Sequence, residues 1–163
     1  MADTFRYQWG DTKPRVENVA TAQAVEIGDL TQLTSGAITR ASDETWDTDL
    51  ATTQANFITN FFGVSMQRKV ANEASAHAVP DNRIRVATAA VFELDCDASD
   101  TYNVGDLVGP AKQTGNLLEN QKVASVAGVT MAIGRVAEKK TSTTLTTVKV
   151  EIMSKVCHGG VQA

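Results

Sequence analysis

Hydrophobic and polar residues alternate along most of the chain, which is the pattern typical of β-strands. The longest such run is RIRVATAAVFEL, residues 83–94, in which every second residue from Ile84 onward lies on one face. A second long run, TLTTVKVEIM, occupies residues 144–153. Shorter runs lie between glycine-containing turns. Short strands joined by such turns predict an all-β sandwich or small barrel.

One stretch, residues 42–63, has helical spacing instead. Its hydrophobic face consists of Leu50, Gln54, Phe57, Ile58 and Phe61. The candidate N-caps are Ser42, Asp43 and Asp47, and the candidate stop residues are Asn60 and Gly63. We therefore predict one short helix at about residues 47–60, placed over an open end of the barrel.

The first 18 residues have no regular period and are predicted to form an extended N-terminal arm. Pro14 excludes a helix through this segment. Phe5, Tyr7 and Trp9 alternate, so a strand here would present three aromatic rings on one face. That face packs either on the arm's own domain or on a neighbouring subunit. Residues 19–155 are predicted to form the β domain, and the glycine-rich residues 156–163 a flexible tail.

Composition narrows the class of protein. The 163 residues are 42% hydrophobic and 21% charged, values of a folded globular chain, and threonine and valine favour sheet. The net charge of −4 argues against a nucleic-acid partner, and we interpret the basic clusters at 67–69 and 138–140 as solvated strand ends. No apolar run is long enough to span a membrane and no signal peptide is evident, so we expect assembly in a cytoplasm.

The histidines and clustered acids do not predict a metal or acid–base site. His77 and His158 lack cysteine or histidine partners at zinc spacing. Asp95, Asp97 and Asp100 lack the glycine and distal glutamate of a helix-loop-helix calcium loop. We interpret both histidines as surface residues and the three acids as solvated strand ends.

Nucleophilic chemistry is not indicated either. Ser65, Ser99 and Ser125 have no nucleophile-elbow context. Cys96 stands between two acids, which raise rather than lower a thiol pKa, and Cys157 has no expected bridge partner. The sequence therefore predicts two free thiols, no enzyme activity and no cofactor.

A repeat is the most informative feature of the chain. VEIGDL, residues 25–30, returns as YNVGDL, residues 102–107. Each copy is followed by a hairpin and then by a glycine-containing strand that ends in basic residues, FFGVSMQRK and MAIGRVAEKK. The glycines supply turn conformations, and the aspartates are expected to bind nearby backbone N–H groups. These structural turn residues are Gly28, Asp29, Gly105 and Asp106. A duplicated turn indicates a duplicated architecture.

The order of these motifs resembles the bacteriophage capsid decoration, or cement, proteins over residues 20–152. The resemblance rests on both GDL turns, on FFGVSMQRK and VFEL, and on MAIGRVAEKK and TLTTVKVEIM. It implies a small β-barrel or β-tulip-like core that trimerises on the outer surface of an icosahedral head. The implied partners are the major capsid protein and two further copies of the chain, at junctions between capsid subunits.

Within that interpretation the arm is the expected capsid grip, adding a strand to an exposed edge of the capsid protein. Its residues are Phe5, Tyr7, Trp9, Pro14 and Arg15. The alternative is another virion module with a small β-barrel, from a tail, a baseplate or a head fibre. A carbohydrate-binding β-domain is a third class, although aromatic residues are few. Oligomeric state separates the first two, because tail proteins form rings or tubes and cement proteins form trimers.

Overall fold

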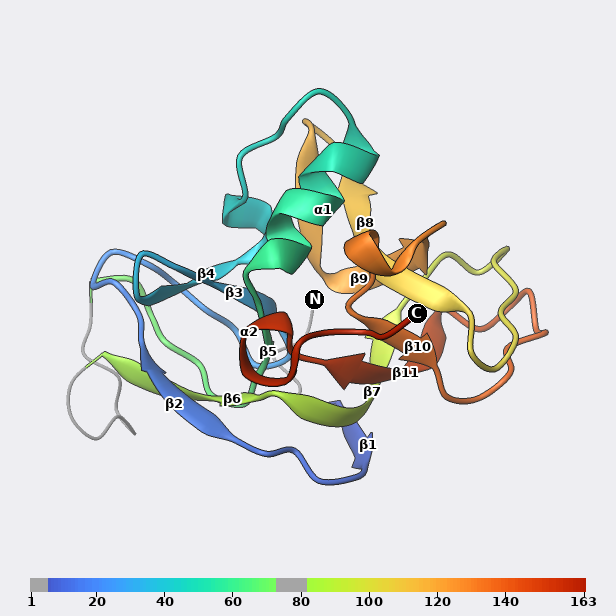
Figure 1. Ribbon diagram of the computed structural model, residues 1–163, viewed down its shortest axis with the longest axis horizontal. Coiled ribbons are helices and arrows are strands. Elements are labelled where there is room, and N and C mark those ends of the chain that lie inside the picture. The colour runs from blue at the N-terminus through green and yellow to red at the C-terminus, as the bar shows by residue number, and fades with distance from the viewer. Residues whose placement is uncertain (1–5, 73–81) are drawn as a thin grey trace.

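A computed structural model describes residues 6–72 and 82–163. Its strands form a six-stranded sheet with the order β1-β7-β11-β10-β8-β9 and a five-stranded sheet with the order β2-β6-β5-β3-β4 (Figure 1). The first sheet consists of β1 (Tyr7–Trp9), β7 (Ala89–Asp95), β8 (Leu107–Gln113), β9 (Leu117–Ser125), β10 (Gly134–Val136) and β11 (Thr147–Met153). The second consists of β2 (Arg15–Asn18), β3 (Leu30–Thr34), β4 (Ala37–Arg40), β5 (Phe61–Ser65) and β6 (Arg83–Ala87). The predicted all-β class is confirmed.

The two sheets repeat one topology. The order β2-β6-β5-β3-β4 in the first half corresponds to β7-β11-β10-β8-β9 in the second, and β1 is an additional strand on β7. In each half the last strand in this order also returns to the first strand and forms one parallel bridge with it. The bridge is Val19–Ile38 in the first half, between β4 and the residue after β2, and Asp95–Lys122 in the second half, between β7 and β9. The sequence repeat is therefore a structural repeat. One bridge per half is less than a continuous ladder, so closure into a barrel stays a prediction.

The N-terminal residues run along both halves. Strands β6 and β7 are separated only by Thr88, and β1 and β2 pair antiparallel with β7 and β6 respectively. Residues 6–18, which we call the strap, therefore lie beside one long, two-part strand (Figure 1). Of the two alternatives for the aromatic segment, the described part packs on its own domain. Phe5 lies outside the described residues.

The helices fill the space around the junction of the halves. Helix α1 (Leu50–Thr59) confirms the predicted helix, but it starts later than expected because Asp49 caps it, accepting from the Thr52 N–H at 2.8 Å. The predicted caps Ser42 and Asp43 lie instead in a 3-10 turn, η1 (Ala41–Asp43), and Asp47 precedes the helix. A second 3-10 turn, η2 (Val129–Met131), lies beside α1.

The core consists of two clusters of buried side chains. The smaller cluster belongs to the first half and contains Val19, Val25, Ile38, Phe62, Ile84 and Val86. The larger cluster contains residues of both halves together with Phe57 and Ile58 of α1. Because one cluster includes both halves, their hydrophobic burial is shared.

The C-terminal residues differ from the expected flexible tail. They begin with a short helix, α2 (Lys155–His158), capped by the Ser154 side chain at 3.1 Å from the Cys157 N–H. Gly160 is buried, and the carbonyl of Gln162 accepts from the Arg135 guanidinium at 2.8 Å. The segment is thus tied back onto the second half.

Candidate functional site

Two aromatic residues of the predicted grip lie on β1, but they do not share a face. The register shifts between Tyr7, opposite Phe92, and Trp9, opposite Val91. Tyr7 packs edge-on against Phe92 with ring centroids 6.1 Å apart. Trp9 is 45% exposed, and the Lys149 ammonium lies 5.4 Å from its ring centroid. The bulge, which simple alternation does not predict, places the two rings against residues that point to opposite faces of β7.

The middle of the strap is held by Thr88, the buried residue between β6 and β7. Its backbone N–H donates to the Thr12 carbonyl at 2.9 Å, and its hydroxyl donates to the Lys13 carbonyl at 2.7 Å. Pro14 and Arg15 follow directly and are exposed, and Arg15 opens β2 opposite Val86. The strap is therefore fixed at its centre as well as along β1 and β2.

The two Gly-Asp-Leu turns have the same geometry. Gly28 and Gly105 have φ angles of +91° and +92°, a region that disfavours residues with a Cβ. The Asp29 carboxylate accepts from the Glu26 N–H at 2.9 Å, and the Asp106 carboxylate accepts from the Asn103 N–H at 2.7 Å. These contacts give the repeated sequence a structural role in both halves.

Two buried lysines form the least expected part of the repeat. Lys69 is 1% exposed, and its ammonium donates to the carbonyls of Thr21 and Gln23, at 2.8 and 3.0 Å, and of Val70 at 3.3 Å. Burial lowers the pKa of Lys69 from its ordinary value. The interpretation of the 67–69 cluster as a solvated strand end was therefore wrong for its last residue.

Lys140 occupies the equivalent place in the second half, so the interpretation of the 138–140 cluster was also wrong for its last residue. It is 5% exposed, and its ammonium donates to the carbonyls of Asp97, Ala98, Asp100 and Ser142. Lys69 also forms a backbone bridge with Val25, and Lys140 forms the same bridge with Tyr102. The signal available in the sequence was the position of both lysines at the same distance after the strand glycine, Gly63 or Gly134.

A polar cleft of about 220 Å³ lies where the halves meet, lined by β4, β8, β9 and the first turn. Asp29 is 2% exposed and accepts from the Gln121 amide at 2.9 Å, so the first turn is bonded directly to the second half. Burial raises the pKa of the Asp29 carboxyl, against the lowering effect of its hydrogen bonds. Asp106 is less buried than Asp29, and no side-chain amide in the described part of the chain donates to its carboxylate.

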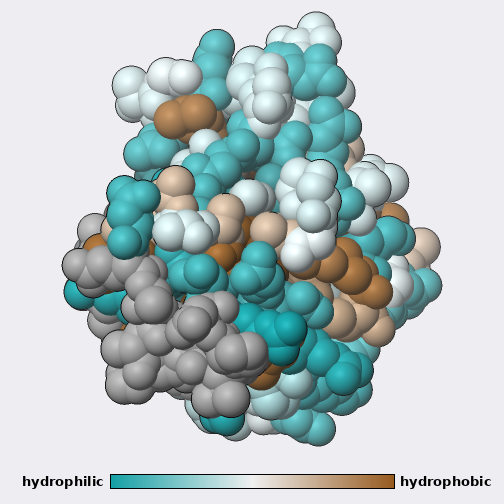
Figure 2. Space-filling model, turned by 90° about the vertical axis from the view of Figure 1, so that its left-hand side faces the viewer, coloured by the Kyte–Doolittle hydropathy of each residue, from teal (hydrophilic) through white to brown (hydrophobic). Residues whose placement is uncertain are grey.

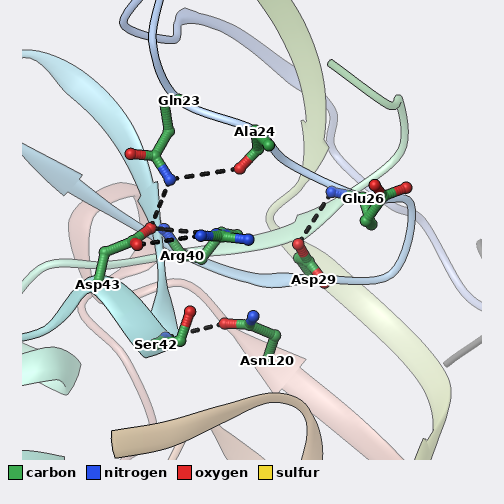
Figure 3. Close-up of polar contacts among 8 residues, drawn as sticks. All are labelled: Gln23, Ala24, Glu26, Asp29, Arg40, Ser42, Asp43 and Asn120. Atoms are coloured by element: carbon green, nitrogen blue, oxygen red, sulfur yellow. Dashed lines mark hydrogen bonds and ion pairs between the residues drawn. The ribbon is translucent and has the colours of Figure 1, made fainter. Parts of the chain in front are cut away.

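The rim of this cleft is held by a second set of contacts (Figure 3). The Asp43 carboxylate accepts from the Arg40 guanidinium at 3.2 Å and from the Gln23 amide at 2.6 Å. The hydrogen bond between Arg40 and Asp43 raises the pKa of Arg40. The Ser42 N–H donates to Asn120 of β9 at 2.8 Å. The Ser42–Asn120 contact therefore joins the first half to β9 of the second half at the rim of the cleft.

The three acids near residue 97 are each engaged separately. Asp95 pairs with Arg6 of the strap, Asp97 pairs with Lys122 at 2.6 Å, and Asp100 accepts from the Tyr102 hydroxyl at 3.0 Å. Among residues 6–72 and 82–163, no group of three or more histidine, cysteine or acidic side chains is arranged to hold a metal ion.

The remaining candidates are likewise separated. His158 of α2 bonds Thr88 at 2.8 Å, whereas His77 lies outside the described residues. Cys96 is buried, which raises its thiol pKa, and Cys157 is half-buried; both are free thiols, as predicted. The Ser65 hydroxyl donates to the Gln67 carbonyl at 2.7 Å. The structure brings none of these groups together with the aromatic residues of β1.

Comparisons with known proteins identify no relative: no family model, curated protein or solved structure matches this chain. No helix in the described part of the chain is long and apolar enough to cross a membrane.

Proposed function

We propose that the protein is a structural virion component, a decoration protein that binds the outer surface of an icosahedral phage head as a trimer. It stabilises junctions between major capsid protein subunits. Support comes from the resemblance of residues 20–152 to decoration proteins and from the duplicated β architecture that carries the resembling motifs.

The observation that carries this proposal is the exposed apolar surface along the strap. Trp9 and Val16 are each 45% exposed, although they lie on strands fixed to both halves. Aromatic residues held rigidly at a surface often dominate the energy of a protein interface. Three copies in a closed ring would present the same contacts three times, so modest contacts would sum to high avidity.

The test measures binding of purified protein to undecorated, expanded capsids of its own phage by co-sedimentation. Deleting the strap is a poor variant, because it also removes β1 and its pairing with β7. Trp9→Ala is sharper and is expected to weaken capsid binding by about tenfold or more. Val104→Ala is the matched control, because Val104 is exposed on the second turn, outside the strap.

Saturable co-sedimentation of the wild type, with a trimer in sedimentation equilibrium of the free protein, would support the proposal. Protein that remains in the supernatant and assembles into rings or tubes would instead support the tail or baseplate alternative. If Trp9→Ala and Val104→Ala bind capsids equally well, the strap is not part of the capsid interface.

A further inference from the structure

The internal repeat reveals an edge that is covered in one half and open in the other. Strand β7 corresponds to β2, and the outer edge of β7 is covered by β1. The contact includes a hydrogen bond of 2.9 Å from the Glu93 N–H to the Arg6 carbonyl. Strand β2 is the last strand of its sheet, and β4 meets its outer edge only at the Val19–Ile38 bridge just beyond its end. No strand in the described part of the chain pairs with this edge at Arg15 and Val16. In the second half, the equivalent edge therefore binds an extended segment as an antiparallel strand.

The backbone of Val16 faces this open edge. Val16 is paired with Arg85 of β6. The Arg85 carbonyl accepts from the Met66 N–H at 2.9 Å, and the Arg85 N–H donates to the Gln67 side chain at 2.8 Å. Opposite residues in an antiparallel pair exchange either both backbone hydrogen bonds or none. Val16 and Arg85 therefore form a non-hydrogen-bonded pair, and the Val16 N–H and carbonyl point outward. Glu93, paired with Lys149, holds the equivalent position on β7.

The side chains around this edge favour an acidic occupant. Lys13, Arg15, Arg83 and Arg85 lie on or next to β2 and β6, and none forms an ion pair with the residues that the structure describes. Glu17 is the one acid on β2, in a chain whose net charge is −4. The end of the molecule at β2 and β4 is otherwise mainly hydrophilic, with smaller hydrophobic patches (Figure 2). The 45% exposed Val16 side chain supplies an apolar contact within the basic group.

We propose that the outer edge of β2 at Arg15–Val16 binds an extended, carboxylate-bearing segment of the major capsid protein as an additional antiparallel strand. The segment takes the position on β2 that β1 takes on β7. Backbone hydrogen bonds to Val16 fix its register, and the four basic side chains select its charge. This inference rests on the proposed function, because the capsid surface supplies the partner.

The sharpest variant is Val16→Pro, which removes the outward N–H and leaves the β2–β6 hydrogen bonds in place. Proline is tolerated on an edge strand where the missing N–H faces solvent. Val16→Thr is the matched control, because it keeps the N–H and the branched shape. Co-sedimentation with expanded capsids is expected to show affinity reduced about tenfold or more for Val16→Pro and nearly unchanged for Val16→Thr. Circular dichroism checks that both variants are folded.

The charge of the partner is tested separately, and this keeps the inference testable if Val16→Pro does not fold. The double variant Arg83→Glu, Arg85→Glu is expected to bind capsids with about tenfold or more lower affinity than the wild type at low salt. The difference from the wild type should shrink as the salt concentration rises. Lys139→Glu, an exposed basic residue of the second half, is the control and is expected to bind as the wild type does.

Each result has one meaning. If wild-type protein does not sediment with capsids, the proposed function and this inference both fail. If the wild type binds and Val16→Pro binds equally well, or Val16→Thr is equally impaired, the edge is not the binding element and only this inference fails. If Val16→Pro converts a trimer to monomers, the edge binds a second copy of the chain, which overturns the capsid segment as its partner.

Discussion

At the scale of single residues, Lys69 and Lys140 are buried, and each ammonium donates to several backbone carbonyls. Replacing Lys140 by methionine keeps the aliphatic stem but leaves four backbone carbonyls without the ammonium that they share. Buried acceptors that lose their donor cost about 1–3 kcal/mol each, and partial hydration reduces the sum. We expect Lys140→Met to lower the free energy of unfolding by about 3 kcal/mol in urea titrations.

The neighbouring residue provides the control for this substitution. Lys139 is exposed, so Lys139→Met is expected to change the unfolding free energy by about 0.5 kcal/mol or less. Lys69→Met should behave as Lys140→Met does, because Lys69 has the equivalent cage in the first half. Similar stability of Lys139→Met and Lys140→Met would show that the carbonyls are satisfied by water once the ammonium is removed.

His158 gives the fold a pH dependence of known sign. Its ring bonds Thr88, and its pKa is lowered from 6.5, first by burial and then by Lys13 and Arg15. The unfolded chain therefore takes up a proton at higher pH than the folded chain. The contribution of His158 to stability is complete above pH 6.5 and is lost as pH falls through the folded-state pKa.

The measurement compares unfolding midpoints of the wild type and His158→Gln between about pH 8 and pH 5. Glutamine keeps a donor for Thr88 but does not titrate, so the wild type should lose more stability on acidification than the variant. The difference isolates His158, because Asp29 and the other carboxylates titrate in both proteins. Parallel pH profiles would contradict the assigned direction.

At the scale of elements, two glycines allow neighbouring strands to approach. A Cβ on Gly63 of β5 would lie 2.0 Å from the Ala87 carbonyl oxygen, and one on Gly134 of β10 would lie 2.2 Å from the Glu151 carbonyl oxygen. Backbone oxygens cannot move aside as a flexible side chain does. We expect Gly63→Ala and Gly134→Ala each to lower the unfolding free energy by about 3 kcal/mol or more, or to prevent folding.

Gly128 is the control for the strand glycines. A Cβ there would meet nothing nearer than 3.8 Å, so Gly128→Ala should be nearly neutral in the same denaturant titrations. A Gly134→Ala protein as stable as Gly128→Ala would mean that β10 and β11 separate at little cost.

The elements also show which features the sequence predicts. Glycine turns, alternating strands and the α1 face depend on local spacing. Gln54, Phe57 and Ile58 of the predicted face are buried on α1, but Phe61 and the predicted stop residue Gly63 lie in β5 because the helix already ends at Asn60. The start of α1 was misplaced because several acids precede it and only Asp49 reaches the Thr52 N–H. The buried lysines were missed because a lysine beside other charges has the composition of a solvated strand end. Their burial depends mainly on carbonyls that lie 40 to 48 residues earlier in the chain, and a local pattern contains no information on such long-range contacts.

At the scale of the whole molecule, the strap illustrates the same limit. Its alternating aromatics indicated a strand but not the strand to which it pairs. The partner, β7, follows some eighty residues later, as the Tyr7–Phe92 pair shows, and the bulge that separates Tyr7 from Trp9 arises from that pairing. The strap, the shared core cluster and the Asp29–Gln121 contact together connect the two halves. We therefore expect the duplicated halves to behave as one cooperative unit.

The two tryptophans allow this cooperativity to be measured directly. Trp9 lies on β1 in the sheet of the second half, and Trp46 precedes α1 in the first half, with the Lys112 ammonium 4.8 Å from its ring centroid. Trp46→Phe leaves a reporter in one half and Trp9→Phe leaves a reporter in the other. Fluorescence unfolding of each variant should give the same midpoint as its own circular dichroism, because shared burial makes partial unfolding costly. If Gly63→Ala or Gly134→Ala folds, it should lower the unfolding midpoint reported by Trp9 and the midpoint reported by Trp46 by the same amount. If Gly134→Ala lowers only the midpoint reported by Trp9, the halves unfold independently.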